Sequence, residues 1–321
     1  MNRRIGESEK RRTSILSLSF TPIRRLTGSP DLFLMITVKA PAKINWSLFV
    51  LDKRDDGYHN ILSLLHGIGL YDLLEFELSD IIALESDLDL PCEQNLVFRA
   101  ASLLKNYSGI KRGARITLKK EIPYGAGLGG GSSDAAYTLM ALNELWELGL
   151  GKNELKSLGA LLGADVPFFF EGPLAVAEGR GEQLTSLPVE MPYVLLLVKA
   201  DCSVPTSWAY GALDEEVRGK TGSTGIEYKM ANIQSIYRAL LSGDIYSIAE
   251  IAHNDFENAV MQRYPAIRAV KEQMVRSGAV TAIMSGSGST VFGLFNDESG
   301  ALNAAGHFPS YFCRVVKTLT S

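Results

Sequence analysis

Cysteine and histidine are scarce in this chain, and neither residue forms a familiar disulfide or metal pattern. Among 321 residues there are three cysteines and four histidines. Cys92, Cys202 and Cys313 lie far apart without a Cys-x-x-Cys pair, and no His-Glu-x-x-His is present. The sequence therefore predicts a reducing, cytoplasmic setting and gives no support for a disulfide framework or a zinc site.

Long apolar runs are also lacking. The longest strand-like apolar run covers residues 194–198, whereas a helix needs about 18 apolar residues to span a bilayer. The composition, 46% hydrophobic and 21% charged, is that of an ordinary globular protein, and the length allows two domains. We therefore expect a full hydrophobic core and no membrane partner.

The formal charge of −4 is unevenly distributed along the chain. Residues 1–34 carry seven basic and three acidic groups, a net of +4, so the remaining residues carry −8. An acidic body argues against nucleic acid as the main partner. Any phosphate that binds must be held by local loops.

Residues 1–34 are rich in arginine and serine and show no helical or strand period. We expect them to form a disordered N-terminal extension. They resemble an arginine- and serine-rich transit peptide, although Glu7 and Glu9 count against it. The preferred alternative is an upstream start codon before Met35, where folded patterning begins.

A glycine-rich loop is the most distinctive stretch of the sequence. Residues 123–134 read Pro-Tyr-Gly-Ala-Gly-Leu-Gly-Gly-Gly-Ser-Ser-Asp, with five glycines in seven residues. Without side chains in the way, the backbone N–H groups of such a loop can converge on an anion. The loop is therefore predicted to bind phosphate.

The segments on either side of the loop strengthen this prediction. Residues 115–119 alternate like a half-buried strand. Ser132, Ser133 and Asp134 can cap a helix whose apolar side includes Leu139 and Leu142. The positive end of that helix would then lie beside the glycines.

Two well-known nucleotide motifs do not fit this loop. Gly125, Gly127 and Gly130 satisfy G-x-G-x-x-G, but a dinucleotide site needs a second strand with an acid about 20 residues on, where this sequence is still helical. A Walker loop needs a lysine that this loop lacks. From the loop alone, a glycine-rich hinge without a ligand remains an alternative.

Several polar residues lie where chemistry is conceivable, although each also has a structural explanation. Residues 36–40 and 44–50 alternate as strands interrupted by Pro41, so Lys43 and Asn45 point to one side, and either could be solvated. A turn at Asp55-Asp56-Gly57 delivers Tyr58 and His59, which could be polar surface.

Asp165 lies on a short connection that we expect to be stiff. Gly163 can end a helix that contains Leu155 and Leu158, and Val166 precedes a proline, which disfavours helical backbone. Asp165 would then join a helix end to an apolar strand. A carboxylate there could be a base or simply a turn-former.

The remaining predicted elements have no evident chemistry of their own. We expect a helix over 94–106, a strand over 193–199, an exposed loop over 215–224, helices over 233–241, 244–253 and 264–277, and strands over 282–284 and 291–295 around a small-residue loop at 285–290.

Four separated motifs together resemble the GHMP small-molecule kinase superfamily. Residues 123–133 match its Pro-x-x-x-Gly-Leu-Gly-x-x-Ser-Ser loop, and 284–290 match its late glycine-rich motif. Within it, Lys-Ala-Pro-Ala-Lys-Ile-Asn at 39–45, Arg-Asp-Asp-Gly-Tyr-His at 54–59 and Gly-Ala-Asp-Val-Pro-Phe at 163–168 resemble the 4-diphosphocytidyl-2-C-methyl-D-erythritol kinase family.

This resemblance implies an α+β fold of two domains with the active site in the cleft between them. The first would be ribosomal-protein-S5-like, over residues 35–190, and the second ferredoxin-like, over 191–321. It also implies phosphoryl transfer from ATP, with Mg²⁺, to the 2-hydroxyl of 4-diphosphocytidyl-2-C-methyl-D-erythritol. That reaction gives the 2-phosphate and ADP in the non-mevalonate isoprenoid precursor pathway.

The resemblance also implies roles for individual residues. Asp165 and Lys43 would be the catalytic residues. Asp165 would accept the proton of the hydroxyl, and Lys43 would keep the Asp165 carboxylate negatively charged. Asn45, Tyr58, His59 and Tyr210 would contact the cytidine diphosphate substrate, with Tyr58 and Tyr210 as aromatic faces; a role for Ser287 stays open. The ATP-binding residues would be Pro123, Gly125, Ala126, Gly127, Leu128, Gly129, Gly130, Gly131, Ser132 and Ser133.

Two rival functions remain. A sister kinase for homoserine or phosphomevalonate would share the loop but lack a nucleobase clamp. A non-enzymatic nucleotide-binding descendant should have lost the Lys43 and Asp165 pair, and both residues are present. The sequence does not identify the ligands of the Mg²⁺ ion, and it leaves a monomer or a homodimer open.

Overall fold

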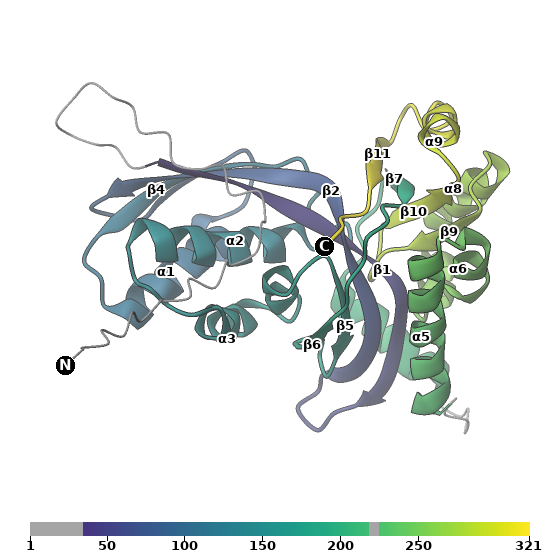
Figure 1. Cartoon of the computed structure of the whole chain (residues 1–321), viewed down its shortest axis with the longest axis horizontal. Coiled ribbons are helices and arrows are strands. Elements are labelled where there is room, and N and C mark those ends of the chain that lie inside the picture. Colours follow the sequence, from purple (N-terminus) through teal and green to yellow (C-terminus); the bar gives the residue numbers. More distant parts are fainter. Residues whose placement is uncertain (1–34, 218–224) are drawn as a thin grey trace, which may run out of the picture.

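The structure is a computed structural model that describes residues 35–217 and 225–321. In these ranges the chain forms two β-sheets, each with its own helices (Figure 1). The extension expected over 1–34 lies outside the described residues, as does most of the loop expected over 215–224. The beginning of that loop is helical.

The larger sheet has seven strands in the described part of the chain, with β3, β4, β2, β1 and β8 side by side in that order, β5 on β2 and β6 on β5. The strands are β1 (Met35–Lys53), β2 (His59–Ser79), β3 (Ala83–Ser86), β4 (Gly113–Lys119), β5 (Leu174–Glu178), β6 (Gln183–Ser186) and β8 (His253–Asn254). The short β8 brings the second half of the chain onto β1 as a parallel neighbour.

The predicted interruption at Pro41 is wrong, because β1 runs through it without a break. Proline lacks an N–H group and is tolerated in a sheet where the ladder is irregular. Here the pairing with β2 shifts register between Pro41, opposite Tyr71, and Ala42, opposite Ile68. Lys43 and Asn45 follow this bulge on one side of the strand, as predicted.

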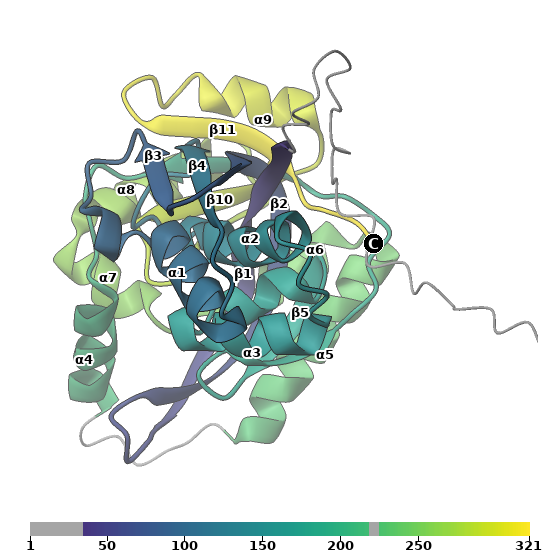
Figure 2. The same cartoon turned by 90° about the vertical axis from the view of Figure 1, so that its left-hand side faces the viewer.

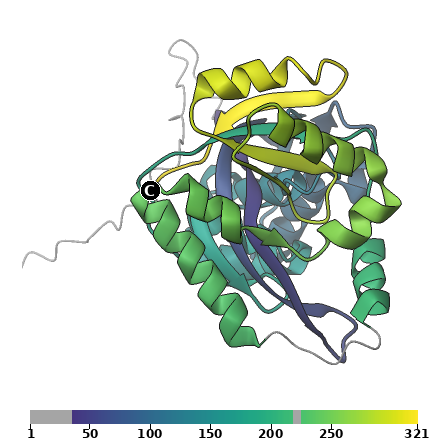
Figure 3. The same ribbon diagram turned by 90° about the vertical axis from the view of Figure 1, so that its right-hand side faces the viewer.

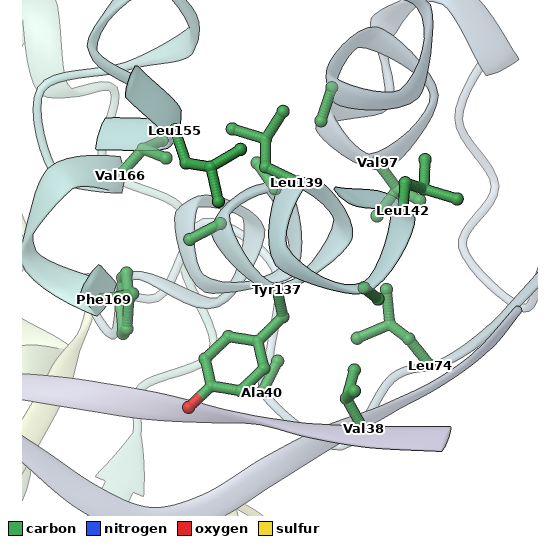
Figure 4. Packing of buried hydrophobic residues seen from close by; sticks show 14 of the residues in the cluster. Val38, Ala40, Leu74, Val97, Tyr137, Leu139, Leu142, Leu155, Val166 and Phe169 are labelled. Carbon is green, nitrogen blue, oxygen red and sulfur yellow. The ribbon is translucent and has the colours of Figure 1, made fainter. Parts of the chain in front are cut away.

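The first group of helices packs on one face of the larger sheet (Figure 2). It consists of α1 (Leu96–Ser108), α2 (Gly130–Leu145) and α3 (Lys152–Leu162), with 3₁₀ turns η1 (Cys92–Gln94) and η2 (Val166–Phe170). In the core, Tyr137 of α2 points toward Ala40 of β1, whereas Leu139 lies on the other side of the helix, toward Leu155 of α3 (Figure 4). Burying this apolar surface fixes α2, and with it the glycine loop, against the sheet.

The smaller sheet is antiparallel, with β11, β7, β10 and β9 in that order. Its strands are β7 (Val194–Lys199), β9 (Thr281–Met284), β10 (Thr290–Phe295) and β11 (Phe312–Lys317). The helices of this half are α4 (Thr206–Val217), α5 (Ile226–Ser242), α6 (Ile245–Ile251), α7 (Glu257–Arg263), α8 (Pro265–Arg276) and α9 (Glu298–Ala305) (Figure 3).

Among the described residues, three helices, α4, α7 and α9, were missed by the sequence prediction. The predicted helix over 244–253 is also too long, since α6 ends at Ile251 and β8 follows. None of the helices in the described ranges has the length and hydropathy that crossing a membrane requires.

Candidate active site

A cleft of about 950 Å³ opens between the two parts of the molecule. Its walls come from β1, the β1–β2 turn, the glycine loop, the α3–η2 connection, α4 and the loop before β10. Most of the predicted site residues line it: Lys43, Asn45, Tyr58, His59, Gly125, Gly127, Gly129, Ser132, Asp165, Tyr210 and Ser287. The fold thus brings together motifs that are more than 200 residues apart in sequence.

The glycine loop has the geometry expected of an anion-binding backbone. Gly125, Gly127 and Gly129 have φ angles of 63°, 79° and 71°, a left-handed conformation in every second residue. Such alternation turns successive N–H groups toward one point, and side chains at these positions would be strained. The helix α2 starts at Gly130, so its positive end adjoins the loop.

The predicted cap of this helix is wrong. Gly129 is the N-cap residue, and Ser132, Ser133 and Asp134 already lie inside α2. The left-handed backbone of Gly129 ends the loop earlier than a serine or aspartate cap would have done. Ser132 still lines the cleft, whereas Ser133 is fully buried.

The other loop residues predicted to bind ATP do not reach the cleft. The side chains of Ala126 and Leu128 are buried and anchor the loop from behind. Pro123, Gly130, Gly131 and Ser133 are likewise not among the residues that line the cleft. Contacts of these residues with ATP, through backbone N–H groups, therefore stay a prediction.

The loop before β10 interlocks with the glycine loop. Ser285 Oγ donates a 2.9 Å hydrogen bond to the Gly127 carbonyl, and Thr290 N donates to the Ala126 carbonyl at 3.2 Å. A Cβ on Gly127 would lie 2.1 Å from the Ser285 carbonyl oxygen. Only glycine allows these two backbones to approach so closely.

Lys43 and Asp165 face each other in the cleft. The Lys43 ammonium lies 3.6 Å from an Asp165 oxygen and donates a 2.9 Å hydrogen bond to Asn45 Oδ1. Asn45 in turn accepts from Gly286 N and donates to Ser63. The Lys43 side chain is 5% exposed and that of Asp165 40%. The lysine is therefore held in place while the carboxylate is open to a ligand.

The backbone around Asp165 differs from the prediction. Asp165 is the N-cap of η2 with helical φ and ψ of −80° and −16°, and Val166 begins that 3₁₀ turn instead of an extended strand. Proline is compatible with the first turn of a helix, because the N–H group that it lacks would be unpaired there. The expected stiffness remains, because η2 packs on α2 and α3.

An aromatic pair also lines the cleft. The His59 and Tyr210 rings are stacked, with centroids 4.8 Å apart and planes at 18°. Burial raises the pKa of Tyr210 to about 12, and the negative charge of Asp165 adds to the shift. Tyr58 is 58% exposed, with the Arg180 guanidinium 5.1 Å from its ring centre. The structure therefore pairs Tyr210 with His59, not with Tyr58.

Sequence reasoning missed four cleft residues that touch the predicted ones. Asp214 accepts from His59 and Lys53, and Thr206 Oγ1 lies 3.0 Å from Ser287 Oγ. The signal for Asp214 was its spacing of four from Tyr210, which becomes visible only once α4 is known to be a helix. Lys53 and Arg180 carried no such signal.

A buried charge cluster supports the glycine loop from behind. Lys120 Nζ bonds Asp72 and, at 2.7 Å, Asp134 of α2. Asp72 also accepts from Glu121 N and Ile122 N. Burial opposes the charge on Lys120, but the two carboxylates outweigh it and raise its pKa. Burial and the charge of Asp72 raise the pKa of Asp134 against the pull of Lys120.

Within the described residues there is no group of three or more His, Cys, Asp or Glu side chains that could hold a metal by themselves. Mg²⁺ in nucleotide sites is usually held by one or two protein oxygens together with phosphates. Asp165 and Ser132 offer oxygens at the cleft wall. The residues present thus fit a Mg²⁺ ion that arrives with nucleotide phosphates.

Comparison with known proteins agrees with this geometry. The family model described as GHMP kinases N terminal domain matches residues 95–173, and the model described as GHMP kinases C terminal matches residues 236–312. Proteins of Thermodesulfovibrio yellowstonii and Prosthecochloris aestuarii, both named 4-diphosphocytidyl-2-C-methyl-D-erythritol kinase, are 50% and 41% identical. The matches cover 89% and 84% of this chain and 98% and 92% of those proteins.

Solved structures give the same picture. A crystal structure of 4-(cytidine 5'-diphospho)-2C-methyl-D-erythritol kinase is 35% identical with a TM-score of 0.72, covering 89% of this chain and 99% of that one. Homoserine kinase from Cytophaga hutchinsonii has a TM-score of 0.70 at 20% identity, over 89% of this chain and 95% of that one. The second likeness is one of fold.

Proposed function

The chain belongs to the 4-diphosphocytidyl-2-C-methyl-D-erythritol kinase family of GHMP kinases, and we propose that its cleft transfers the ATP γ-phosphoryl group to the 2-hydroxyl of that cytidyl substrate. The products are the 2-phosphate and ADP, in the non-mevalonate isoprenoid precursor pathway. The Lys43–Asp165 pair beside the glycine loop is the observation that carries this proposal.

The glycine loop is proposed to hold the ATP phosphates. Phosphoryl transfer depends mostly on positioning and on neutralising charge that spreads over the phosphate oxygens. The left-handed glycines 125, 127 and 129 and the N-terminus of α2 supply N–H groups and a positive dipole end. Mg²⁺, when bound with the phosphates, would neutralise their charge, and Ser132 and Asp165 are residues of the cleft wall that could hold it.

Asp165 is proposed to accept the proton of the attacking hydroxyl. In a loose transition state the proton can leave late, so the orientation of the base matters more than its basicity. Lys43 lies on the same side, held by Asn45, where its charge attracts both Asp165 and the attacking oxygen. Asn45 thus acts through Lys43 and through the loop before β10.

The wall formed by His59, Tyr210 and Tyr58 is proposed to bind the cytidine diphosphate part of the substrate. His59 and Tyr210 present aromatic surface and hydrogen-bonding atoms there, and Tyr58 adds an exposed ring. Arg180 and Lys53 are cations in the same wall. A homoserine kinase has no nucleobase to recognise, so this wall favours the cytidyl substrate over that alternative.

Three further properties belong to the proposal. The domains run over residues 35–190 and 191–321, supported by the two sheets, which divide at this point except for β8.

The protein acts in the cytoplasm, or in a plastid if residues 1–34 are a transit peptide; the three free cysteines suit a reducing compartment. It works as a monomer or homodimer.

A turnover assay with ATP and alternative acceptors tests the proposed function. The kcat/KM for ADP formation should be several orders of magnitude higher with the cytidyl substrate than with homoserine or phosphomevalonate. Only the cytidyl substrate has a nucleobase that can bind to the wall of His59, Tyr210 and Tyr58. Preference for homoserine or a mevalonate compound would contradict the proposal.

A further inference from the structure

Asp214 joins three segments at the edge of the cleft. Its Oδ1 lies 2.7 Å from His59 Nε2 and its Oδ2 lies 2.5 Å from Lys53 Nζ. Lys53 and His59 are themselves paired across the end of the β1–β2 hairpin. One carboxylate of α4 therefore bridges the hairpin to the second half of the chain. The end of the hairpin lies beside α4 (Figure 2).

The same helix also supplies the ring that stacks on His59. Tyr210 and Asp214 are four residues apart in α4, so they lie on one face of the helix. Tyr210 is fixed from its other side by an edge-on contact with Phe256, at 4.9 Å between ring centres. The His59 ring is thus held both by stacking and by a hydrogen bond, and it is 8% exposed.

The hydrogen bond decides which nitrogen of His59 carries a proton. The bonds from Lys53 and His59 lower the pKa of Asp214, so this carboxylate is ionised and can only accept. The proton between them must then reside on His59 Nε2. In the neutral ring Nδ1 is left as an acceptor, and among the described residues no hydrogen-bond partner occupies it.

An acceptor at this position suits one pyrimidine better than the other. Cytosine presents an amino group at its 4-position, which donates, whereas uracil presents a carbonyl there, which accepts. We infer that Asp214 is a positioning residue that fixes the His59 tautomer and so favours cytosine over uracil nucleotides. The inference rests on the proposed function, because it assumes that the substrate's base lies at this wall.

Binding of cytidine diphosphate and uridine diphosphate, measured by titration calorimetry, tests the inference. The wild type should prefer cytidine diphosphate by at least about tenfold. With uridine diphosphate, the 4-carbonyl oxygen of uracil would face His59 Nδ1, and two acceptors cannot form a hydrogen bond with each other. In Asp214→Asn the amide can donate to Nε2, which lets Nδ1 carry the proton. The preference should then fall about tenfold. Since no ATP or turnover is involved, this result is independent of the acceptor assay above.

Glu215→Gln is the matched control, because it removes the same charge from the next residue of α4, which is exposed. It should keep the wild-type preference. Equal binding of both nucleotides by the wild type, an unchanged preference in Asp214→Asn, or the same loss in Glu215→Gln would each overturn the inference. Nitrogen-15 NMR of the wild type provides a check without mutation: His59 should carry its proton on Nε2, and a proton on Nδ1 alone would refute the mechanism.

Discussion

At the scale of single residues, the two members of the proposed catalytic pair, Lys43 and Asp165, have opposite surroundings. Lys43 is buried between the glycine loop, whose Gly129 packs against its alkyl chain, and Gly286 of the second loop. Asp165 projects from a short 3₁₀ turn and remains partly exposed. The alkyl chain of the lysine therefore packs in the interior while its ammonium group supplies a positive charge to the cleft. The aspartate can be altered with little effect on the fold.

Replacing Asp165 with asparagine should lower kcat by about a thousandfold, because the amide has a similar shape but cannot accept the hydroxyl proton. The affinity for an ATP analogue should stay within a few-fold of the wild type. Single-turnover kinetics and calorimetry measure the two quantities. Asp80→Asn, at an exposed position, is the control. Wild-type turnover in Asp165→Asn would remove this residue from catalysis.

Truncating His59 to alanine should raise KM for the cytidyl substrate about ten- to a hundredfold, because a buried hydrogen-bonding ring is lost from the nucleobase wall. Steady-state kinetics should show KM for ATP unchanged. The exposed His307→Ala variant should match the wild type in both constants. An effect on ATP alone would mean that His59 belongs to the nucleotide pocket.

At the scale of elements, the site depends on two loops that fit only as backbone against backbone. Gly127 has φ of 79° and touches the loop before β10, which also bonds Asn45. A displacement of the glycine loop at this contact would also move Lys43, because the backbone N–H of Lys43 donates a hydrogen bond to the Leu128 carbonyl. The two glycine-rich motifs are therefore one structural unit.

A Gly127→Ala variant should lose about a hundredfold in kcat/KM, since the new methyl group displaces the Ser285 carbonyl and shifts the loop by about an ångström. Its melting temperature should also drop, because alanine is strained at positive φ. Gly225→Ala tests the specificity of this effect: its Cβ would meet no neighbour and its φ is −55°. Full activity in Gly127→Ala would show that the loops need not touch.

Much of this element-level organisation was predictable from the sequence, for identifiable reasons. The strand at 115–119, the glycine loop and the helix after it follow from strong local patterns, and the structure confirms them. Pro41 and Val166 misled the prediction, because a bulge and a 3₁₀ turn accommodate proline where local rules forbid it. Asp214 could not be found, because its partners His59 and Lys53 become neighbours only through tertiary contacts.

At the scale of the whole molecule, the C-terminal segment that follows β11 is joined to the larger sheet through a buried histidine. Trp46 Nε1 donates to His66 Nδ1 at 2.9 Å, so the proton of the neutral ring lies on Nε2 and is donated to the Leu319 carbonyl. Leu319 N also donates to the Gly67 carbonyl. The C-terminal residues are thereby attached to the larger sheet.

Burial lowers the pKa of His66 from 6.5 to about 4. Between these values the unfolded chain binds a proton and the folded chain does not, so stability falls as the pH drops below 6.5. The free energy of unfolding should decrease by about 2 kcal/mol from this group by pH 5.

Urea unfolding at pH 7 and pH 5 measures this loss. In His66→Gln the decrease should be smaller by that amount, although the variant is less stable overall. The exposed His307→Gln variant should show the same decrease as the wild type. An equal decrease in His66→Gln would mean that other groups cause the acid sensitivity.

The long strand β1 contributes to three separate hydrophobic clusters, through residues such as Val38, Trp46 and Leu48. Trp46 packs edge-on against Phe292 of β10, nearly 250 residues later in the chain. During synthesis β1 leaves the ribosome long before β10, so the Trp46 indole is not covered by Phe292 until β10 has also emerged. In stalled nascent chains that keep Trp46 as the single tryptophan, with Trp146 and Trp208 replaced by phenylalanine, the emission should stay red-shifted until β10 has emerged.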